Sequence, residues 1–221
     1  MLLPLGGESC VDYIYKVYFD VQWRLKFLAT LSVIFILLYV AVTGASAVLN
    51  FYAATHWGNF TVDFGNRADW FIQLSSIGFL FSAVVVSIWI YRAHANLTFI
   101  GMEGLEFTPG WSVGWFFVPF ANLVMPYRAM RELWERSGAA SDIRWGSVLP
   151  YWWGTFLFGG LLENIGSQMI GAASATAASN GILILAIAQV TRIVSALLLM
   201  QIIRTSTRAE STAASVSATF A

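Results

Sequence analysis

Charged residues are scarce in this sequence, and the scarcity indicates what surrounds the folded chain. Only 11% of the 221 residues are charged and 58% are hydrophobic, whereas soluble domains carry about 25% charged residues. A chain this apolar would aggregate in water, so we expect it to lie in a lipid bilayer. Its formal net charge is zero. There is no basic excess of the kind that binds nucleic acid, and we expect no nucleic-acid partner.

Cysteine and histidine are nearly absent, which removes most metal and redox chemistry. Cys10 is the single cysteine, so no intrachain disulfide or thiolate metal cage forms. The two histidines, His56 and His94, fall at opposite ends of a predicted membrane helix. No phosphate-binding loop, dinucleotide fingerprint or nucleophile–histidine arrangement occurs. We therefore predict a non-enzymatic protein with no catalytic residues and no metal site, while the sequence leaves the identity of any cofactor unknown.

Four long apolar runs are present, and they predict four transmembrane helices. About 20 apolar residues cross the ~30 Å hydrocarbon core, and aromatic residues flank the second and third runs as they do at membrane interfaces. The predicted fold is an all-α integral membrane protein whose membrane domain covers residues 27–203. The predicted spans are residues 27–49, 70–90, 148–170 and 181–203.

Both ends of the chain differ from these spans. Residues 1–26 contain apolar side chains at helical spacing with charges between them. This pattern fits a helix lying in the cytoplasmic membrane interface, and it equally fits an ordinary amphipathic helix packed on a neighbour. Residues 204–221 are rich in serine, threonine and alanine, and we predict a flexible cytoplasmic tail.

A proline-broken aromatic segment lies between the second and third predicted spans. Residues 110–134 read GWSVGWFFVPFANLVMPYRAMRELW, with Pro119 near the middle of the apolar part and charge directly after Pro126. A proline there removes a backbone donor and breaks a helix. Two helical legs made from residues 110–126 would reach about 12 Å each, short of the ~30 Å core. We expect this segment to enter and leave the membrane on the same side.

The distribution of basic residues supports that topology. If residues 110–126 crossed, four basic residues would lie on the side of the N-terminus and seven on the other side. If they do not cross, ten lie with the N-terminus and one, Arg67, lies opposite. The positive-inside rule favours the second arrangement, with both termini cytoplasmic. Five spans with an external N-terminus, seven basic residues inside and four outside, is the alternative.

Two placements of residues 110–126 fit the sequence. A re-entrant hairpin would be sheltered by the spans, because irregular backbone at membrane depth must be covered by protein or line a wet cavity. A shallow interfacial loop would hold its aromatic side chains among the lipid headgroups. In both cases residues 127–136 form an amphipathic helix on the cytoplasmic surface with its aromatic residues inserted. We expect Arg128–Glu132 and Glu132–Arg136 as ion pairs along this helix.

The same region carries a family resemblance. YRAHANL at residues 91–97 and FTPGWSVGWFFVPFANLVMPYRAMRELW at residues 107–134 closely resemble a bacterial family of multi-span membrane proteins, domain of unknown function 4328 (DUF4328). The resemblance implies an integral membrane protein with this segment as its signature, and it brings no catalytic residue or ligand. The signature residues in this chain are Trp111, Trp115, Pro119, Asn122, Pro126, Tyr127 and Arg128.

Two charges fall inside the predicted spans. Glu163 and Arg192 each cost about 2.5–3.5 kcal/mol at a helix centre, so both need partners. At 1.5 Å per residue they lie about 12 Å and 16 Å below the outer boundary, within one helical turn of each other. We expect a contact that either staples the third and fourth predicted spans together or forms a proton, ion or anionic-ligand site.

Two functions follow as hypotheses. The first is an accessory or scaffolding subunit of an assembly in the bacterial cytoplasmic membrane, which binds a membrane-protein partner or a second copy of itself. Ten tryptophans, 17 phenylalanines and 8 tyrosines would supply the apolar contacts with lipid and protein. The second is a small transporter, channel or lipid-handling protein that uses residues 110–126 and the Glu163/Arg192 pair.

Overall fold

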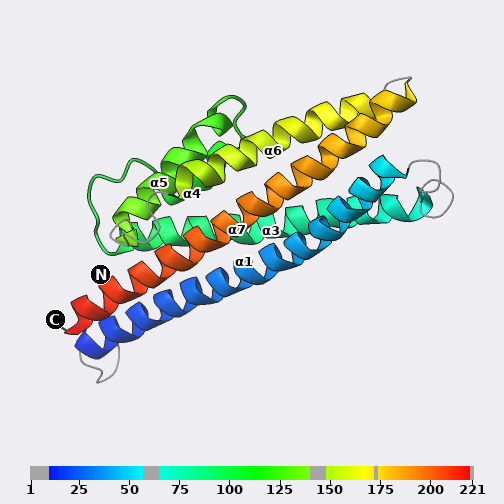
Figure 1. Cartoon of the computed structure of the whole chain (residues 1–221). Coiled ribbons are helices and arrows are strands. Elements are labelled where there is room, and N and C mark those ends of the chain that lie inside the picture. The colour runs from blue at the N-terminus through cyan, green and yellow to red at the C-terminus, as the bar shows by residue number, and fades with distance from the viewer. Residues whose placement is uncertain (1–9, 57–64, 140–147, 172–173, 220–221) are drawn as a thin grey trace. The chain divides into compact units, whose positions relative to one another are not determined.

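All regular elements in the part of the chain that the structure describes are helices, which confirms the predicted all-α class. A computed structural model describes residues 10–56, 65–139, 148–171 and 174–219. Three helices are much longer than the rest (Figure 1). The elements are α1 (Cys10–Thr55), α3 (Gly65–Phe99), α4 (Pro109–Gly114), the 3-10 turns η1 (Trp115–Phe117) and η2 (Ala121–Leu123), α5 (Met125–Arg136), α6 (Leu149–Ile170) and α7 (Ala175–Thr219).

Three helices are long and apolar enough to cross a membrane. Within the described residues they cover Val21–Thr55, Gln73–Phe99 and Thr176–Thr212. They overlap the first, second and fourth predicted spans. The chain is therefore a multi-span membrane protein in contact with the lipid bilayer.

The remaining predicted span, residues 148–170, forms α6. Its 22 residues reach about 33 Å, the thickness of a hydrocarbon core. Helix α6 carries the polar residues Glu163, Asn164 and Gln168, and it is not among the three helices that qualify as spans by length and composition. The length of α6 fits a span, while its composition equally fits a helix packed against protein.

The chain divides into two compact units, each assembled from separate stretches. Unit 1 comprises Met1–Leu31, Val86–Gly146 and Ile203–Ala221, and unit 2 comprises Ser32–Val85 and Ser147–Ile202. Helices α1, α3 and α7 contribute residues to both units. The broken segment with α4 and α5 belongs to unit 1, and α6 belongs to unit 2.

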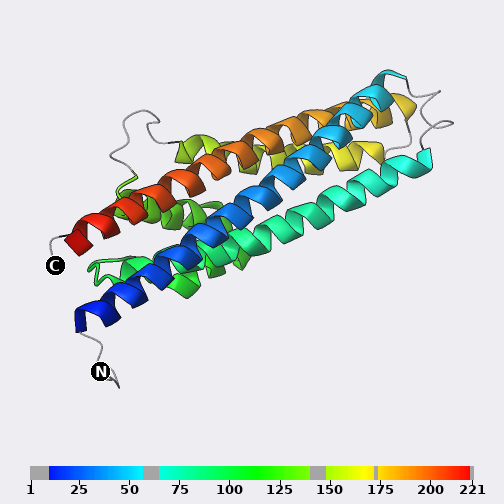
Figure 2. The same cartoon turned by 90° about the horizontal axis from the view of Figure 1, so that it is seen from below.

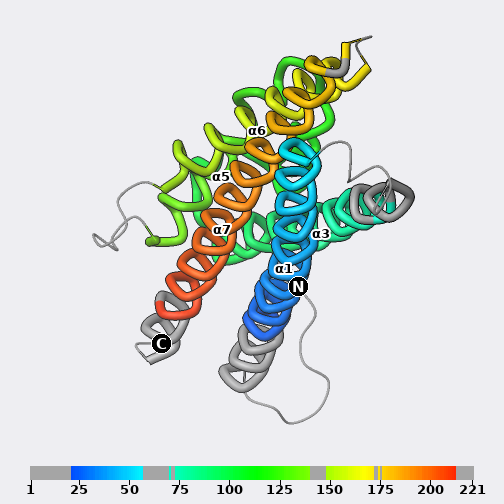
Figure 3. The backbone as a smooth tube through the Cα atoms, turned by 45° about the vertical axis from the view of Figure 1, so that its right-hand side comes forward, coloured from blue at the N-terminus to red at the C-terminus, as the bar shows by residue number. Residues whose placement is uncertain are grey.

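Helix α1 differs from the prediction of a separate interfacial helix over residues 1–26. It runs without a break from Cys10 to Thr55, 46 residues or about 69 Å, and Figure 3 shows the coloured part of α1, from blue to cyan, as one continuous helical tube. The sequence offers a reason, because no glycine or proline occurs between Cys10 and Gly44 to end the helix. The helix therefore includes the first predicted span and extends beyond it. Residues 1–9 lie outside the described part.

Helix α7 also exceeds its predicted length, and a flexible tail from residue 204 is not what the structure has. The helix continues to Thr219, as its red end shows in Figure 2. No glycine or proline follows Gly181, and alanine favours helix. Ile203 and Ser206 are completely buried in unit 1. The start of the expected tail is thus part of a packed core.

In unit 2, α6 and α7 lie side by side (Figures 1 and 2). Their closest approach is at two glycines. A Cβ at Gly181 would lie 2.7 Å from the Gly166 carbonyl oxygen, and a Cβ at Gly166 would lie 2.9 Å from the Gly181 oxygen. Further along, the Ser195 hydroxyl donates to the Trp152 carbonyl at 3.2 Å. Small residues thus let the two backbones touch, and the register of this helical hairpin is fixed at both ends.

The core of unit 1 is formed by α3 and α5, with contributions from α1 and α7. One tryptophan ties α3 to α7: Trp89 is completely buried, and its Nε1 donates to the Thr207 hydroxyl at 3.1 Å. The bulky apolar members of this core, all at most 3% exposed, are Leu25, Ile90, Leu97, Met130, Leu133, Trp134 and Ile203.

Candidate functional site

The signature segment begins with a capped helical turn. Thr108 is the N-cap of α4, and its hydroxyl accepts from the Trp111 amide at 3.5 Å. The buried Ser112 hydroxyl donates to the Pro109 carbonyl at 2.7 Å. A Cβ at Gly114 would lie 3.1 Å from the Trp111 ring, so glycine leaves room for that ring. The local sequence therefore builds a short, rigid turn with Trp111 on its surface.

The segment then reverses around Pro119, as the sequence predicts. Val118 is extended, and Phe120 takes a positive φ of 62° before the turn η2. The amide of Asn122 donates to the Val118 carbonyl at 2.9 Å, and the amide of Val124 donates to the Ala121 carbonyl at 3.1 Å. The break thus forms its own backbone hydrogen bonds, which an irregular segment near lipid needs.

The turn presents several large apolar side chains outward. Phe120 is 87% exposed and Phe117 is 78% exposed, which is unusual for aromatic residues held by rigid backbone. Among the signature residues, Trp115 and Asn122 are half-buried and Pro119 is exposed. We call the following residues the 111–124 apolar surface: Trp111, Phe117, Phe120, Leu123 and Val124, each more than half exposed.

The two flanks of this segment are bonded to each other within unit 1. Arg128 Nη2 lies 2.5 Å from Glu106 Oε1. The Glu132 carboxylate accepts from the amides of Glu106 and Phe107, and Arg136 Nη2 donates to the Gly104 carbonyl at 3.2 Å. These contacts clamp residues 104–107 onto α5. The segment between residues 107 and 128 therefore begins and ends at the same place in unit 1.

The clamp corrects the predicted ion pairs along α5. Arg128 and Arg136 bond to residues 104–106 instead of Glu132, and the Glu132 carboxylate accepts from two backbone amides. The i,i+4 pair that does form is Arg131–Glu135, at 2.7 Å. The hydrogen bond to Glu135 raises the pKa of Arg131, which keeps this exposed cation charged. Sequence spacing alone could not identify the loop as the stronger competitor.

The apolar face of α5 is also placed differently from the prediction. Pro126 occupies the first turn and is buried, as expected, and Tyr127 is half-buried. Met130 and Leu133 are completely buried and Trp134 is 3% exposed. An inserted surface helix would leave these side chains uncovered by protein. They pack in the core of unit 1, so the apolar face of α5 contributes to tertiary packing and is not inserted into lipid.

In unit 2 the structure brings Glu163 and Arg192 together. Arg192 Nη2 donates to Glu163 Oε2 at 2.6 Å. The Arg192 side chain is 15% exposed and that of Glu163 is 41% exposed. The antiparallel hairpin of α6 and α7 places them at matching depth, as their positions in the sequence predict.

The surroundings of Arg192 are adapted to its guanidinium group. A Cβ at Gly159 would lie 3.3 Å from the Arg192 stem, so glycine makes room for the side chain. The guanidinium carbon lies 4.9 Å from the Phe156 ring centre and 5.7 Å from that of Phe79, within the range of cation–π attraction. Arg192 Nη1 is buried and has no hydrogen-bond partner among the described residues. The Nη1 edge of the guanidinium group thus makes no hydrogen bond with the described residues.

Sequence reasoning did not find the aromatic partners of this pair, although part of the signal was present. Phe156 precedes Glu163 by seven residues, two helical turns, and so lies on the same face of α6. Phe79 lies on α3, and no spacing rule connects it to Arg192.

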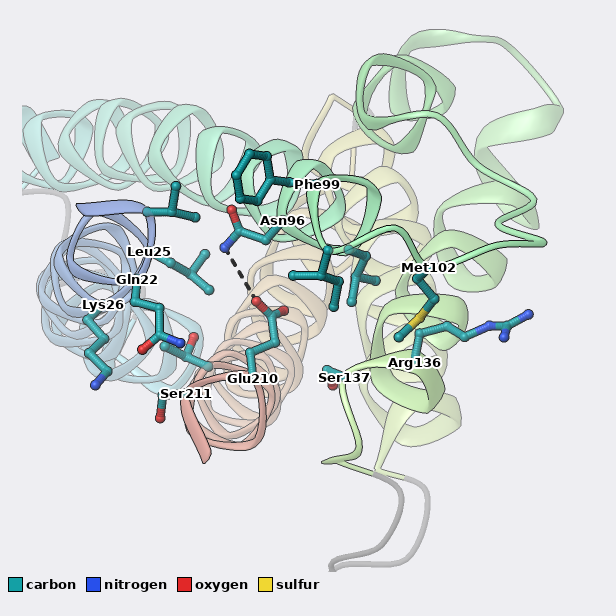
Figure 4. A pocket seen from close by; sticks show the side chains of 14 residues that line it. Gln22, Leu25, Lys26, Asn96, Phe99, Met102, Arg136, Ser137, Glu210 and Ser211 are labelled. Carbon is teal, nitrogen blue, oxygen red and sulfur yellow. Dashed lines mark hydrogen bonds between the residues drawn. The ribbon is translucent and has the colours of Figure 1, made fainter. Parts of the chain in front are cut away.

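A third feature, in unit 1, was missed because its central residue fell in the expected tail. A cavity of about 300 Å³ lies among α1, α3, α5 and α7 (Figure 4). Glu210 reaches into it from α7, and its Oε2 accepts from Asn96 Nδ2 at 3.5 Å. Glu210 Oε1 is buried and has no partner within the described part of the chain. The sequence gave no signal for this site, because Glu210 is a half-buried acid close to the alanine-rich C-terminal end of the chain.

The histidines form no cluster with other metal-ligating side chains. His94 is completely buried on α3, and its Nδ1 lies 3.0 Å from the Ile90 carbonyl oxygen. The exposed His56 stacks on Tyr52 with ring centres 4.6 Å apart. No group of three histidine, cysteine, aspartate or glutamate side chains suited to a metal ion occurs in the residues that the structure describes.

Comparison with known proteins identifies the family and gives no closer relative. The model of the family called domain of unknown function (DUF4328) matches residues 61–208, more than half of the chain. The match includes the signature segment and the Glu163–Arg192 pair. No curated protein and no solved structure matches the chain. With its broken aromatic segment and its membrane helices, this chain belongs to the DUF4328 family.

Proposed function

We propose that the protein is a non-enzymatic, four-span accessory or scaffolding subunit of an assembly in the bacterial cytoplasmic membrane. The observation that carries the proposal is the 111–124 apolar surface. Its side chains are exposed on a backbone that is capped, hydrogen-bonded and clamped to α5. Rigid, exposed aromatic residues form large contacts at little entropic cost, so they suit a binding surface.

The proposal includes a membrane topology of four spans with both termini in the cytoplasm. Helix α6 has the length of a span. The clamp between residues 104–107 and α5 supports a segment that does not cross, since its flanks meet. Phe120 is 87% exposed at the reversal, which supports a shallow interfacial loop more than a sheltered re-entrant hairpin.

Cysteine labelling tests the topology. Cys10 is replaced by serine, and single cysteines are placed at three exposed positions: His56, Glu103 and Glu135. An impermeant maleimide applied to intact cells should label His56→Cys only. Applied to inside-out vesicles, it should label Glu103→Cys and Glu135→Cys. If Glu103→Cys and Glu135→Cys label from opposite sides, residues 110–126 cross and the four-span proposal is wrong.

Native mass spectrometry of the complex purified in mild detergent tests the accessory role. A stoichiometric membrane-protein partner, or a defined homo-oligomer, should be present with the native chain and lost from the Phe117→Ser/Phe120→Ser variant. Phe158→Ser is the matched control, because Phe158 is a 53% exposed phenylalanine on α6 outside the signature segment. A native chain that purifies only as a monomer would contradict the proposal.

A second candidate function rests on Arg192. Its buried Nη1 has no partner in the described residues, and Glu163 is 41% exposed, so a small anion or a proton could exchange at this pair. Intramembrane ionisable residues often mark such pathways. In proteoliposomes, an anion or proton flux that is lost in Arg192→Met but retained in Phe117→Ser/Phe120→Ser would favour a transporter over a scaffold.

A further inference from the structure

The cavity of unit 1 has an apolar wall and a single acid that reaches into it. Leu25, Leu97 and Ile100 supply apolar lining, while Glu210 and Asn96 supply the polar groups. The cavity reaches the surface of the chain, because Phe99 and Ile100 in its lining are 57% and 47% exposed. Its volume of about 300 Å³ lies at the lower end of the range for small-molecule sites.

The Glu210 carboxylate is poorly compensated by the protein. Its one hydrogen bond, from Asn96, is 3.5 Å long, and its Oε1 is buried without a partner in the described residues. A buried carboxylate with an unused oxygen is unfavourable unless a cation or hydrogen-bond donor approaches it. None of the described residues places a positively charged or donating group at this oxygen.

The cations in the cavity lining do not fill that role. Lys26 and Arg136 are both exposed, and Figure 4 shows their side chains extending away from Glu210. Arg136 donates to the Gly104 carbonyl as part of the clamp. No ion pair with Glu210 occurs among the described residues. No described residue therefore supplies a donor to Glu210 Oε1.

The position of the cavity indicates the character of that donor. Asn96 and Phe99 lie at the end of the apolar helix Gln73–Phe99, and Glu210 lies near the end of Thr176–Thr212. The ends of apolar helices lie where lipid headgroups meet the hydrocarbon core. A ligand arriving there carries its polar head and its apolar chain together.

We propose that this cavity binds the primary ammonium group of an amphiphile. The ammonium group supplies three donors, enough for both Glu210 oxygens and the amide oxygen of Asn96. The adjoining apolar chain lies against Leu97 and Ile100. A free alkylamine and an aminophospholipid headgroup share this chemistry, and the arms of the test separate them.

Binding to the purified full-length chain in a neutral detergent tests the proposal. The probes are dodecylamine and dodecanol, which share a chain and differ in the charged donor, each competing with a fluorescent alkylamine. Dodecylamine should compete at least about tenfold better, because a hydrogen bond to a charged group is worth that factor or more. Equal competition by the two probes would overturn the proposal.

Variants and lipid nanodiscs identify the site and the source. Glu210→Gln keeps the shape and should weaken dodecylamine binding at least about tenfold, whereas Glu103→Gln, an exposed acid outside the lining, should not. If a lipid is the source of the ammonium group, native mass spectra from nanodiscs should show that the chain retains phosphatidylethanolamine in preference to phosphatidylglycerol. If there is no such preference but dodecylamine binds tightly, a free amine is the source. Unchanged dodecylamine binding by folded Glu210→Gln would overturn the assignment. If that variant does not fold, the dodecylamine–dodecanol comparison on the native chain decides.

Discussion

Unit 1 and unit 2 each hold a buried or half-buried carboxylate on or beside α7, and the two are satisfied in opposite ways. Glu163 in unit 2 lies 2.6 Å from a guanidinium nitrogen of Arg192. Glu210 in unit 1 has only a 3.5 Å hydrogen bond from Asn96 and no cation within the described residues. A carboxylate paired inside its own fold holds helices together, whereas an unpaired one in a cavity leaves its interaction for a ligand.

The largest expected effect is in unit 2. Glu163→Gln leaves the largely buried Arg192 cation without its counter-ion. Breaking a buried pair by removing one partner costs about 3–5 kcal/mol, and the 41% exposure of Glu163 reduces this. We expect the free energy of unfolding to fall by about 2–4 kcal/mol, measured by circular dichroism during denaturation in detergent. The Glu163→Gln/Arg192→Met double variant should recover most of the loss; a double variant as unstable as the single one would show that the pair is not the source.

The next largest effect concerns the backbone contact that sets the register of this pair. Gly181→Ala would place a Cβ 2.7 Å from the Gly166 carbonyl oxygen, which forces α6 and α7 apart. Such overpacking costs about 1–3 kcal/mol, visible as a lower Tm. Gly154→Ala is the matched control on α6, because no atom lies within 4 Å of its added Cβ. The control should gain up to about 1 kcal/mol from alanine's helix propensity. Equal effects of both substitutions would contradict the close approach.

In unit 1 we expect removal of the carboxylate charge to have the opposite effect on the free energy of unfolding. Glu210→Gln removes a charge that the protein does not compensate, so the free energy of unfolding should stay the same or rise by about 1 kcal/mol. Thermal denaturation of the ligand-free protein in detergent measures this directly. A loss above about 2 kcal/mol would make Glu210 a structural group like Glu163, and the contrast between the two units would disappear.

The smallest expected effect is at the clamp. Arg128 and Glu106 are 47% and 53% exposed, so Arg128→Ala should cost less than about 1 kcal/mol of global stability. Amide hydrogen exchange should nevertheless speed up locally at residues 103–107, because one contact that holds them is lost. Arg131→Ala, which breaks an exposed pair within α5, should leave that exchange unchanged. Faster exchange in both variants would mean that α5 as a whole is loosened.

Features that depend on local sequence were predictable. Pro119 removes a backbone donor, and the structure reverses direction there. Glu163 and Arg192 meet because two antiparallel helices of known rise fix their relative depth. The family assignment also came from two nearby stretches, residues 91–97 and 107–134, and the family model matches residues 61–208.

Features that depend on tertiary competition were not predictable. Arg128 and Glu132 would form an acceptable i,i+4 pair in isolation, but in the fold Arg128 bonds to Glu106 and Glu132 accepts from the backbone amides of residues 106 and 107. The apolar stripe of α5 fits insertion into lipid and packing into a core equally well. The cavity around Glu210 joins residues from four helices that are far apart in the sequence, so no window of sequence contains it.

Phe120 combines an unfavourable backbone conformation with a highly exposed side chain. Its φ of 62° belongs to the region where glycine is comfortable and a side chain with a Cβ costs about 1–3 kcal/mol. The ring gains little in return inside the chain, since the residue is 87% exposed. Glycine would form the same reversal with less strain. Under the proposed function, a contact between this ring and a partner would offset the backbone strain at Phe120.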